Sequence, residues 1–216
     1  MERNIHIGEI IRDATVFNLQ EWGKAAMKAD ALLEIVQRLF SLFKERQIDY
    51  VLVGGIALLS YVPGRNTKDI DLLMPPAALD KLPEITITGR EKFFARGSYE
   101  NLPIDILLTE NPLFEKVFRD YSISRRFQEA EIPVATVEGL LLLKLYALPS
   151  LYRQGDFTRV SIYENDIAVL MHTFEPDMNR LFRELHAHLP ATEMDSLREI
   201  VTEIEERIRR FRNHQT

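Results

Sequence analysis

Residues 49–74 of the 216-residue chain read DYVLVGGIALLSYVPGRNTKDIDLLM, and most of the fold prediction rests on them. Residues 49–53 are mostly apolar and partly β-branched, which predicts a short buried strand. Gly54 and Gly55 end this strand, and residues 56–61 predict a short helix. A glycine pair lets a bound phosphate approach the backbone closely, and the helix directs its N-terminus at the same place. An ordinary strand-to-helix turn uses glycines in the same way, so both interpretations stay open.

Two aspartates lie on the next expected strand, residues 69–74 (DIDLLM). Side chains alternate along a strand, so Asp69 and Asp71 share one face while Ile70 points into the core. Two carboxylates on one face repel each other, and a hard, oxygen-preferring cation such as Mg²⁺ relieves that repulsion. The alternative is a surface strand that carries two solvated acids.

A third carboxylate, Asp105, lies within the apolar stretch LPIDILL at residues 102–108. An acid in the middle of a core strand is rare without a partner. If this strand pairs beside the strand of Asp69 and Asp71, the three carboxylates converge. They can then hold two metal ions roughly 3.5–4 Å apart, the arrangement used in phosphoryl and nucleotidyl transfer. The alternative is a buried Asp105 that backbone donors satisfy.

A glycine pair after a strand, an Asp-x-Asp motif and a third acid on a later strand follow one another in this order. The arrangement resembles the nucleotidyltransferase superfamily, which includes DNA polymerase beta and the kanamycin and minimal nucleotidyltransferases. The resemblance implies that Asp69 and Asp71 bind both metal ions. It also implies that Asp105 binds one of them and can accept the proton of the attacking hydroxyl. Gly54 and Gly55 would adjoin the nucleotide.

Within this superfamily, the sequence GRNTKDID at residues 64–71 looks most like the abortive-infection (AbiEii-type) toxin enzymes. Those enzymes carry an Arg and a Ser or Thr just before the Asp-x-Asp motif. The resemblance implies that Arg65 clamps a phosphate of the nucleotide and that Thr67 hydrogen-bonds it. A solvated loop is the alternative for both residues.

The toxin enzymes also carry a helix with Lys-Leu-x-Ala, followed by a helix with an Asp. Lys144 opens the matching sequence KLYA, and Asp166 matches the later acid approximately. Tyr163 stands where the toxin pattern often has a further Asp. The resemblance implies that Lys144 contacts a phosphate and that Asp166 binds Lys144 or assists with the base or ribose. The alternatives are a Lys144 that extends outward to solvent and an Asp166 on a solvated helix face.

The whole chain predicts an α+β fold, with a small mixed β-sheet and flanking helices followed by a helical C-terminal lobe. We expect a nucleotidyltransferase core with an N-terminal helix over residues 1–148, a helical lobe over residues 149–216, and a catalytic cleft between them. Further helices are predicted at 24–46, 77–82, 112–119, 136–148, 160–173, 176–188 and 191–212, strand-like pieces within 84–107, and a linker at 149–158.

The composition is that of a soluble globular protein, with 46% apolar and 28% charged residues. The chain has no cysteine, which excludes disulfides and thiolate metal sites. No apolar run approaches the roughly 20 residues of a membrane span, and no signal peptide is recognised, so we expect a cytoplasmic protein with no membrane partner. The net charge of −6 argues mildly against a dedicated DNA-binding module.

These features and the resemblance together predict a Mg²⁺-dependent enzyme with a two-metal site, which transfers the NMP part of an NTP such as ATP to a hydroxyl group. By resemblance, the acceptor is the 3′ end of a tRNA or a protein hydroxyl, and a toxin of this type would have a cognate antitoxin. One alternative is a catalytically inactive nucleotide-binding or antitoxin-like partner, against which the three retained acids argue. The other is a small-molecule, antibiotic-type nucleotidyltransferase, which the net charge of −6 fits slightly better than an RNA substrate does.

Overall fold

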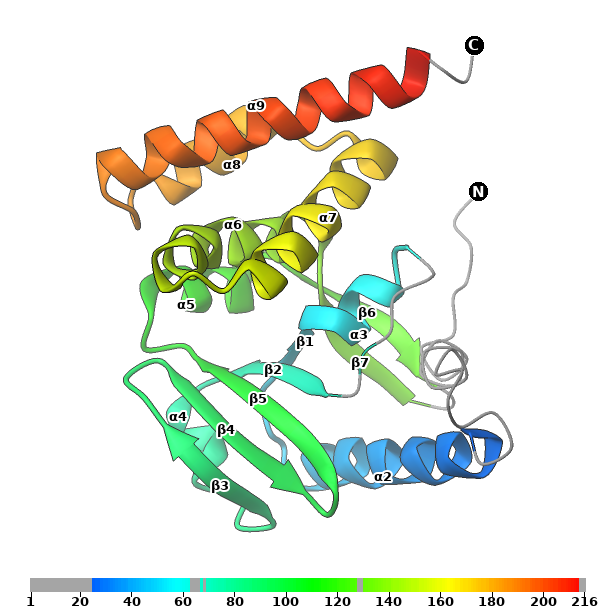
Figure 1. Cartoon of the computed structure of the whole chain (residues 1–216). Coiled ribbons are helices and arrows are strands. Elements are labelled where there is room, and N and C mark those ends of the chain that lie inside the picture. The colour runs from blue at the N-terminus through cyan, green and yellow to red at the C-terminus, as the bar shows by residue number, and fades with distance from the viewer. Residues whose placement is uncertain (1–24, 63–66, 68, 128–129, 214–216) are drawn as a thin grey trace. The chain divides into compact units, whose positions relative to one another are not determined.

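The computed structural model describes residues 25–62, 67, 69–127 and 130–213, with side chains described from Leu33 onward. The chain divides into two compact units, Met1–Thr136 and Val137–Thr216. The first unit carries a mixed β-sheet with flanking helices, and in its described part the second unit is helical (Figure 1). The predicted α+β class is therefore confirmed.

The sheet of the first unit has seven strands in the order β3-β4-β5-β2-β1-β7-β6. Strands β2 and β5 are parallel, as are β1 and β7, and the other neighbours are antiparallel. The predicted strands at 49–53 and 69–74 and the strand-like pieces within 84–107 are all present. The strand bounds are β1 Val51–Val53, β2 Ile70–Met74, β3 Ile85–Arg90, β4 Phe94–Tyr99, β5 Leu102–Leu108, β6 Ser122–Phe127 and β7 Ala130–Ala135.

Helix α2 (Ala25–Glu45) packs against the sheet through aromatic side chains. Phe40 stacks on Tyr50, which comes just before β1, with ring centroids 5.7 Å apart, and meets the Phe127 ring of β6 edge-on at 5.2 Å. Phe43 adds a second contact to Tyr50, at 4.7 Å. Burial of the phenol raises the pKa of Tyr50. These rings join α2 to the part of the sheet that contains β1 and β6.

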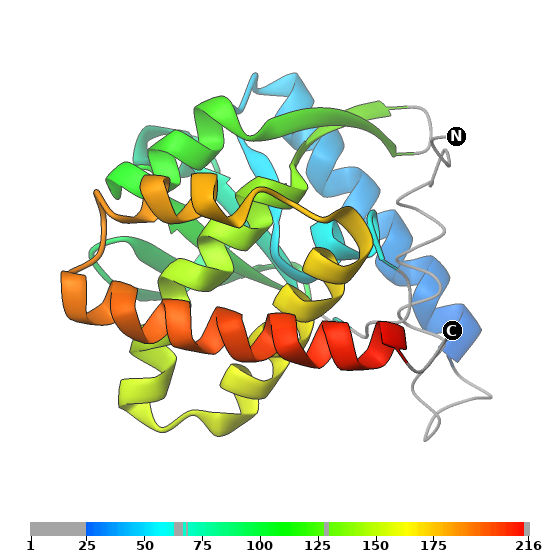
Figure 2. The ribbon, with the colours of Figure 1, turned by 90° about the horizontal axis from the view of Figure 1, so that it is seen from above.

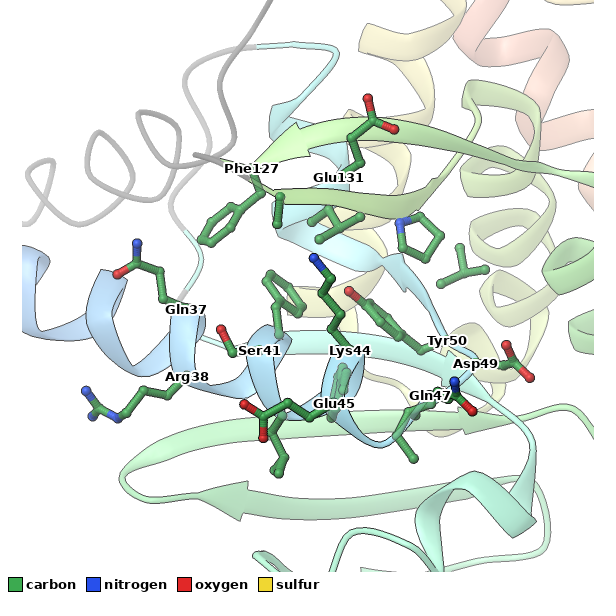
Figure 3. Close-up of a pocket in the computed structure, with 18 of the residues that line it drawn as sticks. Gln37, Arg38, Ser41, Lys44, Glu45, Gln47, Asp49, Tyr50, Phe127 and Glu131 are labelled. Carbon is green, nitrogen blue, oxygen red and sulfur yellow. The ribbon is translucent and has the colours of Figure 1, made fainter.

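A pocket beside these rings is lined by α2, β7 and the segment around β1 (Figure 3). Lys44, Tyr50 and Phe127 are among the side chains that line it. The strand pairings place Phe127 and Leu52 on one face of the sheet and Asp71 on the other. The pocket and α2 therefore belong to the face that the Asp-x-Asp motif does not use.

Three short helices complete the described part of the first unit: α3 (Gly54–Leu59), α4 (Pro76–Leu79) and α5 (Pro112–Asp120). Figure 1 shows α3 on the side of the sheet away from α2. Each helix begins and ends within three residues of the range that the sequence predicts. Helix α5 begins where Asn111 caps it, because the Asn111 Oδ1 accepts hydrogen bonds from the backbone N–H groups of Leu113 and Phe114.

Replacing the cap of α5 should destabilise the first unit. We expect Asn111→Ala to lower the free energy of unfolding by about 1–2 kcal/mol, because two backbone N–H groups lose their acceptor at a buried position. Asn111→Asp retains an acceptor and should recover most of the loss. Urea unfolding followed by circular dichroism measures both variants. Equal stability of wild type and Asn111→Ala would contradict the role of this cap.

The β6–β7 hairpin is an element that the sequence pattern does not predict. Strand β6 is mostly exposed and carries Arg125 and Arg126, so it lacks a clear apolar alternation. Strand β7 contains Pro133, which has no N–H to donate within a sheet. Only the sheet shows that Val134 of β7 lies beside Leu52 of β1. Long-range pairing, rather than local propensity, defines these two strands.

The second unit is built from four helices in its described residues: α6 (Val137–Gln154), α7 (Phe157–Phe174), α8 (Met178–Leu185) and α9 (Ala191–Asn213). Helix α6 packs against α7, α8 and α9, and α9 also packs against α7 (Figure 2). Asp156 caps α7 and Asp177 caps α8, each through a hydrogen bond from a backbone N–H. No helix among the described residues is long and apolar enough to cross a membrane.

The predicted linker at residues 149–158 is wrong. Helix α6 continues through Pro149 to Gln154, and the turn consists of Gly155, with a φ of +68°, and Asp156. Proline removes one hydrogen bond from a helix interior, which normally disfavours it there. Leu148, Pro149 and Leu151 are all buried, so the packing of this turn outweighs the lost bond. The expected domain boundary at residue 148 falls inside α6.

Candidate metal and nucleotide site

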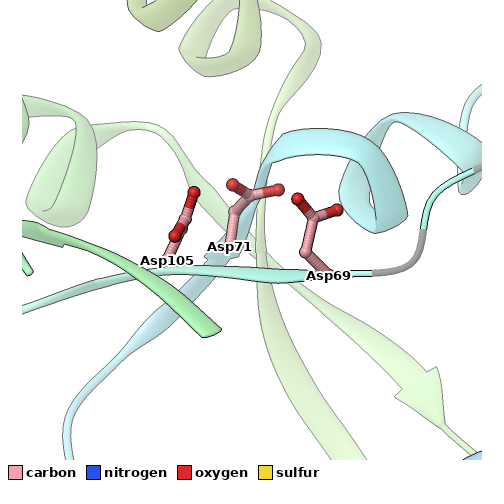
Figure 4. A group of neighbouring side chains, drawn as sticks. All are labelled: Asp69, Asp71 and Asp105. Carbon is pink, nitrogen blue, oxygen red and sulfur yellow. The ribbon is translucent and has the colours of Figure 1, made fainter. Parts of the chain in front are cut away.

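Three carboxylates converge at one place in the first unit. Asp69, Asp71 and Asp105 each offer an oxygen, and these oxygens lie within 4.8 Å of one another. Figure 4 shows the three side chains projecting to the same side of the strands that carry them. The structure therefore brings together the three acids that the sequence singles out.

The register of the sheet produces this convergence. Asp71 on β2 is the direct neighbour of Asp105 on the parallel strand β5, and Asp69 comes one residue before β2. Ile70 and Ile104 are fully buried on the opposite face, whereas the acids are partly exposed. Strand alternation thus sends the carboxylates to one side and the core residues to the other. The alternative of a buried Asp105 with backbone donors is wrong, since its carboxylate is partly exposed.

The glycine pair lies directly against the acids. Gly54 has a φ of +65°, and a Cβ built there would lie 1.8 Å from the Asp71 Oδ2. The Gly55 N–H donates a hydrogen bond of 3.2 Å to the same oxygen. A Cβ at Gly55 would lie 2.6 Å from the Thr67 Oγ1. Both glycines are required by close approach, and at Gly54 the backbone conformation adds a second reason.

Gly54→Ala should displace Asp71, because the new methyl group and the carboxylate cannot occupy the same space. We expect the metal-dependent activity that is proposed in the next subsection to fall about 10–100-fold, the usual effect of disturbing a metal ligand's support. Gly89→Ala is the matched control, since a Cβ there meets nothing within 4 Å. Activity assays at saturating Mg²⁺, with melting curves to verify folding, compare the two variants. Unchanged activity in Gly54→Ala would contradict the close contact.

Each acid of the cluster accepts a hydrogen bond from a different part of the chain. The Thr67 Oγ1 donates to the Asp69 Oδ1 at 2.7 Å, and the Arg96 Nε donates to the Asp105 Oδ1 at 3.0 Å. Together with the Gly55 N–H, these donors hold all three carboxylates in defined orientations. Arg96 is a residue that the sequence analysis misses, because its proximity to Asp105 follows only from the pairing of β4 with β5.

The donor set fits a hard divalent cation such as Mg²⁺ or Mn²⁺. All three side chains present carboxylate oxygens, which such cations prefer over nitrogen or sulfur. Oxygens within 4.8 Å of one another are close enough to share an ion. Because Gly54 has no side chain, the Asp71 carboxylate occupies space that a Cβ at position 54 would fill.

Lys144 and Asp166 form a buried ion pair inside the second unit. The Lys144 Nζ lies 2.7 Å from the Asp166 Oδ2, and both residues are at least 94% buried. The ammonium also lies 4.3 Å from the centroid of the Tyr163 ring. Of the roles open to Asp166, the structure shows the pairing with Lys144, and a contact with a base or ribose stays a prediction. An outward-pointing Lys144 and a solvated Asp166 are both wrong.

Three of the predicted phosphate contacts, those of Arg65, Thr67 and Lys144, are not tested by the structure. Arg65 lies outside the described residues, so its proposed phosphate contact stays a prediction. Thr67 is described and hydrogen-bonds Asp69, which gives it a role in orienting the acid. Its predicted contact with a phosphate, and that of Lys144, also stay predictions.

The architecture of the chain is similar to that of solved nucleotidyltransferase-like proteins. An antigenic nucleotidyltransferase-like protein from Paracoccidioides brasiliensis superposes with a TM-score of 0.53 at 16% identity, covering 81% of this chain and 88% of that one. The antibiotic-resistance factor ANT(2″)-Ia gives 0.50 at 12% identity, covering 86% and 98%. No family model and no curated protein sequence matches the chain. At these identities the likeness shows a shared fold.

Proposed function

We propose that this protein is a metal-dependent nucleotidyltransferase. The observation that supports this function best is the meeting of Asp69, Asp71 and Asp105 beside the Gly54–Gly55 turn, within a nucleotidyltransferase-like fold. A fold hosts many functions, so the argument rests on the site and uses the fold as support. The reaction joins an acceptor hydroxyl oxygen to the α-phosphorus of an NTP and breaks the bond from that phosphorus to pyrophosphate.

The three acids divide the work of the site. Asp69 and Asp71 would hold both divalent cations, and Asp105 would hold one. The cations, most simply Mg²⁺, would supply positive charge for the phosphate oxygens and orient the two reacting oxygens. Asp105 would also accept the proton of the attacking hydroxyl, which needs a base within hydrogen-bond reach. Thr67, Gly55 and Arg96 would keep the carboxylates oriented throughout.

Three classes of acceptor fit the proposed reaction: a tRNA, a protein hydroxyl and a small hydroxyl compound. The resemblance to abortive-infection toxins favours the 3′ end of a tRNA or a protein hydroxyl, with a cognate antitoxin as partner. The likeness to an antibiotic-resistance factor and the net charge of −6 favour a small hydroxyl compound. An acidic chain repels an RNA backbone unless a local basic patch offsets its charge.

Transfer of radioactive label tests the function and separates these acceptors. Each of the four α-³²P nucleoside triphosphates is incubated with the protein and Mg²⁺, together with total tRNA, protein and small-molecule antibiotic fractions. We expect label in one fraction only, and its loss with EDTA and in an Asp69→Asn/Asp71→Asn variant that still folds. Nucleotide binding without turnover in any fraction would favour the inactive binding partner instead.

A further inference from the structure

An ion pair joins the basic side chain of Arg96 to the acid cluster. It lies on β4 as the direct neighbour of Asp105 on the antiparallel strand β5. Its Nε donates to the Asp105 Oδ1 at 3.0 Å. A pair in register across two strands holds both side chains on the same face, so this contact is built into the sheet.

A second contact restrains the guanidinium. Phe94 lies two residues before Arg96 and therefore on the same face of β4. The Arg96 Cζ lies 5.4 Å from the centroid of the Phe94 ring, within the range of a cation–π contact. The side chain of Arg96 is 53% exposed, so solvent and ions reach it. Ring, strand register and carboxylate together fix the guanidinium of an otherwise long and mobile side chain.

We propose that Arg96 is a positioning residue for the third metal-binding carboxylate. It occupies the Oδ1 of Asp105 and so fixes the rotation of the carboxylate, which leaves the Oδ2 as the oxygen for a divalent cation. The inference rests on the metal-binding role proposed above for Asp105. Outer hydrogen-bond partners of this kind orient metal ligands and typically change metal affinity 10–100-fold.

Two other roles for Arg96 make different predictions. As an ordinary surface ion pair, it would contribute little, and its loss would leave metal binding unchanged. As a cation that competes for Asp105, its loss would strengthen metal binding, because the cluster would become more negative. A positioning role predicts the opposite sign, since a freely rotating carboxylate binds the metal more weakly. The sign of one measured change therefore separates all three roles.

The test is a titration of the full-length protein with Mn²⁺ alone, in which electron paramagnetic resonance measures free Mn²⁺. We expect Arg96→Ala to raise the Kd for Mn²⁺ roughly 10-fold or more. Arg96→Lys should recover only part of this loss, because an ammonium lacks the fixed fork geometry of a guanidinium. Arg90→Ala is the matched control: Arg90 is an exposed arginine on the neighbouring strand β3 and should leave the Kd unchanged.

The titration distinguishes a failure of the role proposed for Arg96 from a failure of the metal site itself. If wild type binds Mn²⁺ and Arg96→Ala binds it equally well or more tightly, the positioning role is overturned while the metal site stands. Complete recovery by Arg96→Lys would also overturn it, because a point charge would then suffice. If wild type binds no Mn²⁺, or binds it no better than Asp71→Asn does, the metal site and the role of Arg96 are both refuted. Melting curves of each variant ensure that only folded protein is compared.

Discussion

Asp71→Asn should abolish nucleotidyl transfer without destabilising the metal-free protein. We expect transfer to fall on the order of 10³-fold, because the metal ions would stabilise the charge of the transition state by several kcal/mol. Asp71 is the central acid of the cluster: it neighbours Asp105 across the sheet and lies two residues from Asp69. An asparagine has the same shape but supplies a neutral oxygen, which holds a divalent cation weakly.

The same substitution removes electrostatic repulsion from the folded protein. Three carboxylates within 4.8 Å of one another destabilise the fold when no cation is bound. The amide oxygen of an asparagine at position 71 can still accept the hydrogen bond from the Gly55 N–H. We therefore expect the Tm of metal-free Asp71→Asn to equal or exceed that of wild type.

Parallel measurements of label transfer and thermal melting test this expectation. Asp80→Asn is the matched control, since Asp80 is an exposed acid outside the cluster and should leave both quantities unchanged. An Asp71→Asn variant that keeps half of the wild-type activity would refute a metal-binding role for Asp71. A large fall in its Tm would mean that the carboxylate serves the fold rather than the chemistry.

Lys144→Met should strongly destabilise the second unit. We expect it to lower the free energy of unfolding by about 3–5 kcal/mol, because it leaves the buried Asp166 carboxylate without its cation. The substitution also removes the cation–π contact between the ammonium and the Tyr163 ring. Denaturant unfolding of the full chain, followed by far-UV circular dichroism, measures the loss.

A double variant separates the cost of the orphaned charge from the value of the pair. Lys144→Met/Asp166→Leu removes both charges, and it should recover most of the stability lost in Lys144→Met. Lys116→Met is the control: Lys116 pairs with Asp120 at 3.7 Å on the surface, and its loss should change stability by less than about 1 kcal/mol. Wild-type stability of Lys144→Met would contradict the burial of this pair.

The acid cluster could be predicted from the sequence because the rules behind it are local. Alternation along a strand places Asp69 and Asp71 on one face whatever the rest of the fold does. An acid such as Asp105 inside an apolar stretch signals a partner, since burying it alone is costly. Gly54 and Gly55 directly after a strand indicate a place where another group approaches the backbone closely. Local rules therefore predict the three candidate metal ligands and the order in which they occur along the chain.

Other features depend on contacts that are distant in sequence. Arg96 reaches Asp105 only because β4 pairs with β5 in one particular register. Pro149 stays inside a helix because it and its neighbours Leu148 and Leu151 are buried by tertiary packing. Lys144 is buried because α7 supplies Asp166 and Tyr163. For Pro149 and Lys144, tertiary packing overrides a local preference, whereas the contact of Arg96 has no local signal at all.

The most direct test of a divalent-cation site at the acid cluster is anomalous X-ray scattering from crystals of the protein grown with Mn²⁺ and a non-hydrolysable nucleoside triphosphate. The account predicts manganese peaks about 2.1 Å from carboxylate oxygens of Asp69, Asp71 and Asp105, with the nucleotide phosphates on the same ions. A bound nucleotide whose manganese lies away from these three residues would contradict it, as would an ordered acid cluster with no peak at saturating Mn²⁺.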